Sequence, residues 1–271
     1  MNTIKIHITL FIFIFSINTL YPQDRDFPYE LKNQDLLLLP LGTGLSLWNE
    51  YLSGQVDHPN VYMIRTLNRN NINKFDRSAT YYWSPGWSDQ SDLYRNILIF
   101  SAFLSSIPPV FRGKFTQSIT LGTMMAESFF FLRTITHLTK IVTHRERPYL
   151  YNTKLSAEKR YEFYSSHSSF AFYSGHTAAA FLATTFLSKV STDIYGNTTG
   201  GKFLWVSSLT VAALTGYARI KAGMHYPTDV ITGAVVGVAV GYLVTSLHKK
   251  NTDDRISMNI SQNHISLCFY F

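Results

Sequence analysis

Several kinds of residue are scarce in this chain of 271 residues, and each scarcity excludes a class of protein. The one cysteine, Cys268, excludes an internal disulfide and a cysteine-ligated metal site. Charged residues make up 15% of the chain, against roughly 25% in soluble domains, so the protein is either membrane-embedded or unusually apolar. No recognisable nucleic-acid-binding motif is present, so the net charge of +7 favours lipid headgroups or phosphoesters over nucleic acid.

The N-terminus has the pattern of an export signal. Lys5 precedes an apolar run from Ile8 to Leu20, which is short for a membrane span and resembles a secretory signal peptide. Because no clear small-x-small triplet precedes Gln23, an uncleaved anchor is the alternative. We divide the chain into this signal peptide or anchor (1–23), an N-terminal helical and loop region (24–92), a helical core (93–250) and a C-terminal tail (251–271).

Five apolar segments have the length of helices, and strand-like alternation is rare among them. They are residues 96–110, 118–135, 176–187, 203–217 and 230–247. A shorter apolar stretch at 36–48, broken by Pro40, predicts a peripheral or re-entrant helix, and residues 53–92 predict short helices and loops. We therefore expect an all-α, membrane-embedded bundle of five or six core helices.

The last apolar segment places Gly233, Gly237 and Gly241 four residues apart. A ridge of small residues favours close helix packing in a membrane, and a tightly packed soluble helix is the alternative. Beyond it the tail changes period, because apolar and polar residues alternate from Ile256 to Ile260. This alternation predicts a short C-terminal β-hairpin that acts as a packing flap.

Two motifs in the middle of the chain suit phosphate binding. In the first, Lys140 and Arg147 follow an apolar helix and offer two positive groups to phosphate oxygens. In the second, Ser174 and Gly175 immediately precede a helix, where backbone N–H groups bind anions and a glycine permits close approach. His176 lies in the first turn of that helix, where it could protonate a leaving oxygen. A solvated basic cluster and a capping turn are the alternatives.

A third motif combines Arg219, His225 and Asp229. Arg219 ends one apolar helix, and Thr228 is a natural N-cap for the next. Asp229 can accept a hydrogen bond from one ring nitrogen of His225, which leaves the other nitrogen free to attack phosphorus. The alternative is a helix connection with a structural Asp–His contact.

Taken in order, Lys-x6-Arg-Pro, Ser-Gly-His and Arg-x5-His-x3-Asp resemble the signatures of the type 2 phosphatidic acid phosphatase (PAP2) family. That family shares its fold and site with bacterial class A acid phosphatases and vanadium haloperoxidases. The resemblance covers about residues 70–248 and implies that 93–250 form the phosphatase core. The run from Asn73 to Arg77 also resembles bacterial members of the cell envelope.

The resemblance implies a role for each motif residue. His225 would be the nucleophile that forms a phosphohistidine, Asp229 would orient it, and His176 would protonate the leaving alkoxide and then activate water. The residues implied to bind phosphate are Lys140, Arg147, Ser174, Gly175 and Arg219. The family implies no metal and no cofactor, because cations and backbone donors stabilise the developing charge.

Two positions depart from the family pattern. Tyr173 stands where proline is usual, and Ala218 stands where serine is usual. Tyr173 would alter the loop and the pocket wall, and therefore substrate choice. Among the other histidines, His137 and His144 are expected to support the first motif or to lie on the surface, and His248 to be a charge at a helix end.

We expect a metal-independent phosphatase that hydrolyses a lipid phosphate or a polyprenyl pyrophosphate. Its expected place is the bacterial inner membrane, with the active site facing the periplasm and the loops at Lys114, Lys189 and Lys249 facing the cytoplasm. The alternatives are a soluble periplasmic acid phosphatase of broad specificity, a vanadate-dependent haloperoxidase and a non-catalytic lipid-phosphate binder. The sequence leaves the substrate and the oligomeric state open.

Overall fold

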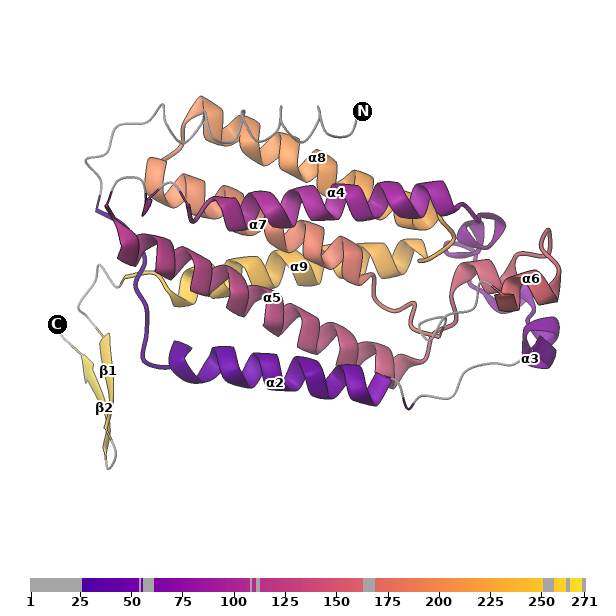
Figure 1. The fold of residues 1–271 in the computed structure, drawn as a ribbon, viewed down its shortest axis with the longest axis horizontal. Coiled ribbons are helices and arrows are strands. Elements are labelled where there is room, and N and C mark those ends of the chain that lie inside the picture. The colour runs from indigo at the N-terminus through magenta and orange to yellow at the C-terminus, as the bar shows by residue number, and fades with distance from the viewer. Residues whose placement is uncertain are drawn as a thin grey trace.

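The computed structural model describes residues 26–53, 55, 61–107, 109–110, 113–162 and 169–250, together with the backbone of two short strands. The predicted signal peptide or anchor at 1–23 lies outside the described residues. Within them the chain is a bundle of roughly aligned helices, with the short helices gathered at one end (Figure 1). The expected all-α bundle is confirmed.

In the described residues the bundle consists of six long helices, and five short ones accompany them. The long helices are α2 (Asp35–Ser53), α4 (Pro85–Leu104), α5 (Phe115–Thr143), α7 (Gly175–Tyr195), α8 (Thr199–Lys221) and α9 (Pro227–Leu247). The short helices are α3 (Val61–Thr66), η1 (Arg69–Asn71), η2 (Arg77–Tyr81), η4 (Pro148–Tyr151) and α6 (Ala157–Glu162). The short helices predicted within residues 53–92 are therefore present.

All five predicted apolar helices occur, with altered bounds. The largest difference is in α4, which begins at Pro85 rather than at residue 96 and ends at Leu104. Ser84 caps this helix by accepting the Trp87 N–H at 3.4 Å, and proline suits a first helical turn. The boundary drawn between residues 92 and 93 therefore falls inside a helix.

α2 is one continuous helix, where the sequence predicted a peripheral or re-entrant helix in a stretch broken by Pro40. It runs through Pro40 and packs along α5, where Asn49 Nδ2 donates to the Thr134 carbonyl at 3.3 Å. Its outer face exposes large apolar side chains, of which Leu36 is 79% exposed. The helix is peripheral, as expected, but it is not interrupted.

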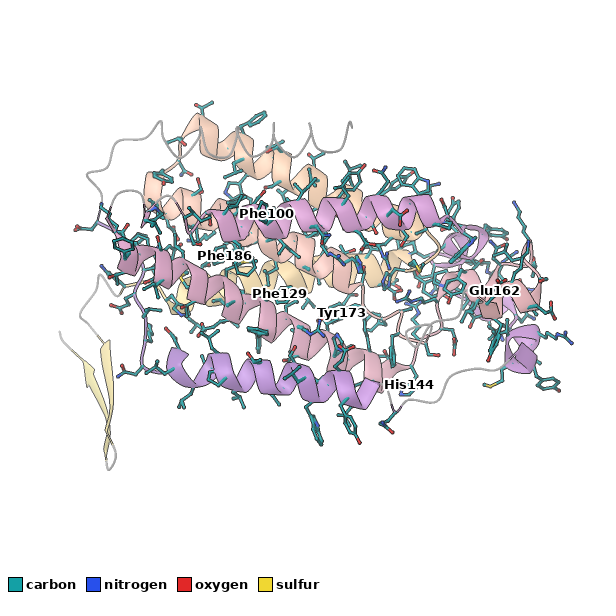
Figure 2. The ribbon with its side chains drawn as sticks, in the orientation of Figure 1. Phe100, Phe129, His144, Glu162, Tyr173 and Phe186 are labelled. Atoms are coloured by element: carbon teal, nitrogen blue, oxygen red, sulfur yellow. The ribbon has the colours of Figure 1, made fainter. Side chains whose placement is uncertain are left out.

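α7 is the central helix of the bundle and packs against α4, α8 and α9. Its side chains are buried over most of its length, whereas each neighbour keeps an exposed face. Phe186 of α7 is fully buried, and Phe100 of α4 is 62% exposed (Figure 2). The core of the protein therefore surrounds α7.

The glycine ridge of α9 faces α7. A Cβ added to Gly237 would lie 2.1 Å from the Ala178 carbonyl oxygen, and one added to Gly233 would lie 2.6 Å from the Ser174 carbonyl oxygen. No other residue fits this distance, so the ridge predicted from the sequence brings two helix backbones into direct contact. The contact includes the start of α7, where the second motif lies.

Two antiparallel strands, β1 (Ile256–Ser261) and β2 (His264–Phe269), follow α9, with Ile256 opposite Phe269. Their side chains lie outside the part of the chain that is described. The proposed role of the tail as a packing flap therefore stays a prediction, as does the hairpin itself.

Gly237→Ala tests the contact between α7 and α9. The added methyl would overlap the α7 backbone, and overpacking of this kind costs about 1–3 kcal/mol. We expect a lower midpoint of thermal unfolding for the purified protein in detergent. The matched control is Gly44→Ala in α2, where an added Cβ meets no atom within 4 Å. Equal midpoints for the two variants would contradict the close approach.

Candidate active site

The three motifs meet at one end of the bundle. Lys140 lies in the last turn of α5, His176 in the first turn of α7, and Arg219 in the last turn of α8. The loop from α8 to α9 turns at Gly223, whose φ is +73° and where a Cβ would lie 2.3 Å from the Tyr82 carbonyl oxygen. Only glycine permits this turn, which places the next residues over the end of α8.

His225 is buried in this loop, with 1% of its surface exposed. Its Nδ1 donates to the Ala171 carbonyl at 2.7 Å, so Nε2 is the nitrogen that carries the lone pair. Burial holds the pKa of His225 well below its ordinary value, and the charges of Arg219, Arg147 and Lys140 act in the same direction. The imidazole is therefore neutral at neutral pH, as a nucleophile must be.

Asp229 does not make the predicted hydrogen bond to His225. Its Oδ2 lies 3.7 Å from His225 Nδ1 and instead accepts the Tyr226 N–H at 2.8 Å. Its Oδ1 pairs with Arg145 at 2.5 Å. Asp229 therefore lies near His225 and fixes the loop that carries it, but makes no hydrogen bond to the ring.

Arg145, to which the sequence analysis gave no role, is the centre of a buried ion network. Its guanidinium pairs with Asp229, pairs with Asp76 at 2.7 Å and lies 4.0 Å above the Tyr226 ring. Asp76 also accepts the N–H and the hydroxyl of Thr228, at 3.0 and 2.7 Å. Burial alone would raise the pKa of Asp76, but hydrogen bonds from Thr228 and Arg145 bring it below the ordinary value.

The N-cap of α9 also differs from the predicted one. Thr228 lies within the first turn of the helix, and Tyr226 is the N-cap residue. Pro227 occupies the first helical position, where its missing N–H removes no hydrogen bond. The N-cap predicted from a threonine before an apolar run was therefore two residues too late.

Three positively charged residues, Lys140, Arg147 and Arg219, are called the site cations below. Arg219 Nη1 donates to Ser88 Oγ and Ser91 Oγ of α4, at 3.1 and 3.2 Å. Arg147 Nη1 contacts the Met224 sulfur at 3.1 Å. The Nε of each arginine is buried without a hydrogen-bond partner, so each keeps a donor for a ligand.

The start of α7 supplies further donors. Ser174 is fully buried and caps the helix, because its Oγ accepts the Thr177 N–H at 3.3 Å. A Cβ on Gly175 would lie 3.7 Å from Lys140 Nζ, so that lysine reaches the helix N-terminus. Free N–H groups and a nearby ammonium form an anion site. Ser174 shapes this turn, and its hydroxyl is already engaged by the cap.

His176 makes the close histidine–carboxylate contact that was predicted for His225. Its Nε2 lies 2.7 Å from Asp92 Oδ1 of α4, and Arg95 Nη1 lies 3.3 Å from the same oxygen. The partners His176 and Asp92 are 84 residues apart in the sequence. No local pattern could have predicted this contact.

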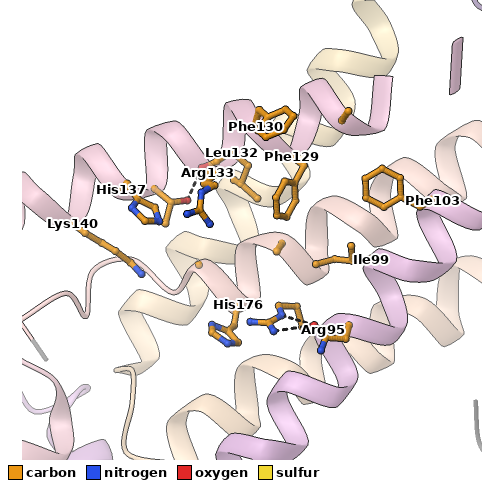
Figure 3. A pocket seen from close by; sticks show the side chains of 15 residues that line it. Arg95, Ile99, Phe103, Phe129, Phe130, Leu132, Arg133, His137, Lys140 and His176 are labelled. Atoms are coloured by element: carbon orange, nitrogen blue, oxygen red, sulfur yellow. Dashed lines mark hydrogen bonds between the residues drawn. The ribbon is translucent and has the colours of Figure 1, made fainter. Parts of the chain in front are cut away.

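A pocket of about 710 Å³ lies beside His176, between α4, α5 and α7 (Figure 3). One part of its wall is polar and consists of Arg95, Arg133, His137, Lys140 and His176. Another part is apolar and includes Ile99, Phe103, Phe129, Phe130 and Leu132. Tyr173, which was expected in the pocket wall, is instead buried and hydrogen-bonded to Thr136 Oγ1 at 2.9 Å. His225 does not line this pocket.

Comparison with known proteins identifies the class. The chain matches the PAP2 superfamily over residues 118–253, which include all three motifs, and it belongs to that family. A similar solved structure is a transmembrane PAP2-type phosphatidylglycerolphosphate phosphatase from Bacillus subtilis, with 19% identity and a TM-score of 0.47. The alignment covers 76% of this chain and 94% of that chain. No curated protein matches the chain. Membership of the family supports a phosphatase.

Removing Arg145 would leave Asp76 and Asp229 buried without their counter-charge, which costs about 3–5 kcal/mol. We expect Arg145→Ala to lower the midpoint of thermal unfolding strongly. The matched control, Arg65→Ala, removes an exposed ion pair with Glu158 that is worth less than about 1 kcal/mol. If both variants unfolded at the same temperature, the network would not hold the loop.

Proposed function

We propose that the protein is a metal-independent phosphatase that hydrolyses a lipid phosphate through a phosphohistidine intermediate. The observation that carries the proposal is His225. It is buried and neutral, its proton is held by the Ala171 carbonyl, and the site cations surround it. A neutral imidazole beside unpaired guanidinium donors suits attack on a bound phosphate.

In the first step, Nε2 of His225 attacks phosphorus, and a P–N bond forms as the P–O bond to the leaving group breaks. Positive charge develops on the ring, and the Ala171 carbonyl and the Asp229 carboxylate stabilise it. The site cations and the Gly175 N–H bind the non-bridging oxygens, and the unpaired Nε–H groups of Arg147 and Arg219 are donors for this purpose.

His176 then acts as acid and base. It gives a proton to the leaving oxygen and later takes one from the water that attacks the phosphohistidine. Asp92 accepts the Nε2–H of His176, which fixes the ring and leaves Nδ1 to exchange the proton. Burial and the charge of Arg219 lower the pKa of His176 in the empty site, and the negative charge of a bound phosphate would oppose this shift. The attack of water breaks the P–N bond, releases phosphate and restores His225.

A lipid substrate is supported by the pocket and by the outer surface. The pocket joins a basic part to a phenylalanine-lined part, which suits a headgroup phosphate attached to an apolar chain. α8 and α9 are long and apolar enough to cross a membrane. Large apolar side chains are exposed around the bundle, among them Leu37, Val142, Val206 and Val235. Such a surface is expected where lipid replaces water.

The distribution of lysines supports one orientation in the membrane. Lys114, Lys189, Lys202 and Lys249 all lie at or near helix ends opposite the active site. The positive-inside rule would place that end in the cytoplasm and the active site in the periplasm of a bacterial inner membrane. A polyprenyl pyrophosphate is a further candidate substrate, because it also carries a terminal phosphate on an apolar chain. Release of the protein without detergent would instead favour the soluble acid phosphatase.

Replacing His225 tests the nucleophile. We expect His225→Asn to lower phosphate release by at least about a thousandfold, from phosphatidic acid in micelles and from nitrophenyl phosphate, because no P–N bond can form. EDTA should leave the rate of phosphate release by the wild type unchanged. His144→Asn is the matched control, since His144 lies outside the site at φ +44°, a conformation that asparagine tolerates. Activity near wild type in His225→Asn would refute the nucleophile.

Replacing Asp92 tests the proposed role of His176 as the general acid. Asp92→Asn should slow the cleavage of alkyl phosphates by about a hundredfold or more, and the cleavage of nitrophenyl phosphate much less, because a good leaving group needs little protonation. The ratio of the two kcat values is the measurement. Asp89→Asn, an exposed carboxylate on the same helix, should leave the ratio unchanged. Equal losses on both esters would show that Asp92 does not support an acid.

A further inference from the structure

A second group of ionisable side chains lies at the opposite end of the bundle. It consists of Asp35 in the first turn of α2, Glu127 in α5 and His248 at the C-cap of α9. α9 separates His248 from His225 by its 21 residues, a length of about 30 Å. The group therefore takes no part in the phosphate chemistry.

The three side chains are buried and converge. His248 Nε2 lies 3.3 Å from Asp35 Oδ2 and 3.2 Å from Glu127 Oε2, and side-chain exposure is 2%, 5% and 7% for His248, Asp35 and Glu127. One ligand atom from each residue lies within 4.8 Å of the others. Ligands about 2.1 Å from a tetrahedral Zn²⁺ are about 3.4 Å apart, so the spacing suits a shared metal ion.

Several atoms of the group are buried without a hydrogen-bond partner, namely Asp35 Oδ1, Glu127 Oε1 and His248 Nε2. His248 Nδ1 donates to the Val244 carbonyl at 2.9 Å, so Nε2 is the ring nitrogen that faces the two carboxylates. Buried acceptors that face one another need a cation among them. A ring N–H bonded to a backbone carbonyl is also the usual support of a metal-bound histidine.

The backbone holds the group in place. The Lys32 N–H donates to Asp35 Oδ2 at 2.7 Å, and the Glu30 N–H donates to the His248 carbonyl at 2.9 Å. The residues before α2 therefore lie directly against the end of α9. His248, expected as a charge at a helix end, is at that end but is buried between two acids.

We propose that Asp35, Glu127 and His248 bind a divalent transition-metal ion, with Zn²⁺ the best match, and that this ion fastens the N-terminal segment to the far end of the bundle. One imidazole nitrogen and two carboxylate oxygens suit Zn²⁺ better than Mg²⁺ or Ca²⁺, which prefer oxygen ligands alone. The ion stabilises the fold and leaves catalysis to the residues at the other end.

The test uses the full-length protein in detergent, stripped with a chelator and titrated with Zn²⁺ alone. We expect about one bound Zn²⁺ per chain by elemental analysis and a rise in the unfolding midpoint of about 5 °C. Asp35→Asn and Glu127→Gln keep the shape and remove a charged ligand, so each should weaken Zn²⁺ binding at least about tenfold and abolish the rise. Mg²⁺ should give no rise.

Asp89→Asn and Glu162→Gln are the matched controls, because they neutralise exposed carboxylates away from the group and should keep both effects. Zn²⁺ binding that is absent in the wild type, or equal in the wild type and the two cluster variants, overturns the proposal and leaves a protonated His248 between two acids. If a cluster variant fails to fold, the wild-type stoichiometry and midpoint decide. Phosphate release is measured separately and distinguishes this result from a failure of the active site.

Discussion

The site depends on one buried ion network, in which Arg145 lies between Asp76 and Asp229. The same residue uses its carbonyl to accept the Ala171 N–H at 2.8 Å, and the Ala171 carbonyl in turn accepts the proton of His225 Nδ1. One arginine therefore fixes both the carboxylate that anchors the loop of His225 and the peptide that orients His225, the proposed nucleophile. Because unpaired buried charges are costly, any arrangement that separated the three groups would be strongly disfavoured.

A second constraint brings the two histidines to the same end of the bundle. The glycine ridge lets α9 lie directly on α7, and at the start of this contact the Ser174 N–H donates to the Asp229 carbonyl at 3.0 Å. The second and third motifs are thereby joined through their backbones. α4 completes the site from the other side, where Asp92 meets His176 and two serines meet Arg219. The close packing of α9 on α7 therefore also sets the relative positions of the second and third motifs.

The sequence predicted the parts of this arrangement that leave a local pattern. Apolar periodicity identified the long helices, the spacing of Gly233, Gly237 and Gly241 identified the packing ridge, and the three motifs identified residues that the fold brings to one end. The sequence did not predict hydrogen bonds whose partner is distant in the chain or is a backbone atom. Asp229 was paired with His225 because it follows four residues later, whereas the true acceptor is a backbone carbonyl, which has no sequence signature. Ser91, 128 residues from Arg219, could be found only from the fold.

Two arginines, two residues apart, show how the same side chain serves structure and chemistry. Arg145 is paired with two buried carboxylates, so its charge is already compensated and is not available to a substrate. Arg147 contacts the thioether of Met224, and Arg219 contacts two neutral hydroxyls. Their charges repel each other and that of Lys140, and no described carboxylate forms an ion pair with either arginine. In the proposed function a phosphate dianion would supply the missing negative charge, and its binding would relieve the repulsion among the site cations. Arg145 uses its charge to hold the nearby loop, whereas Arg147 and Arg219 would keep theirs for the substrate.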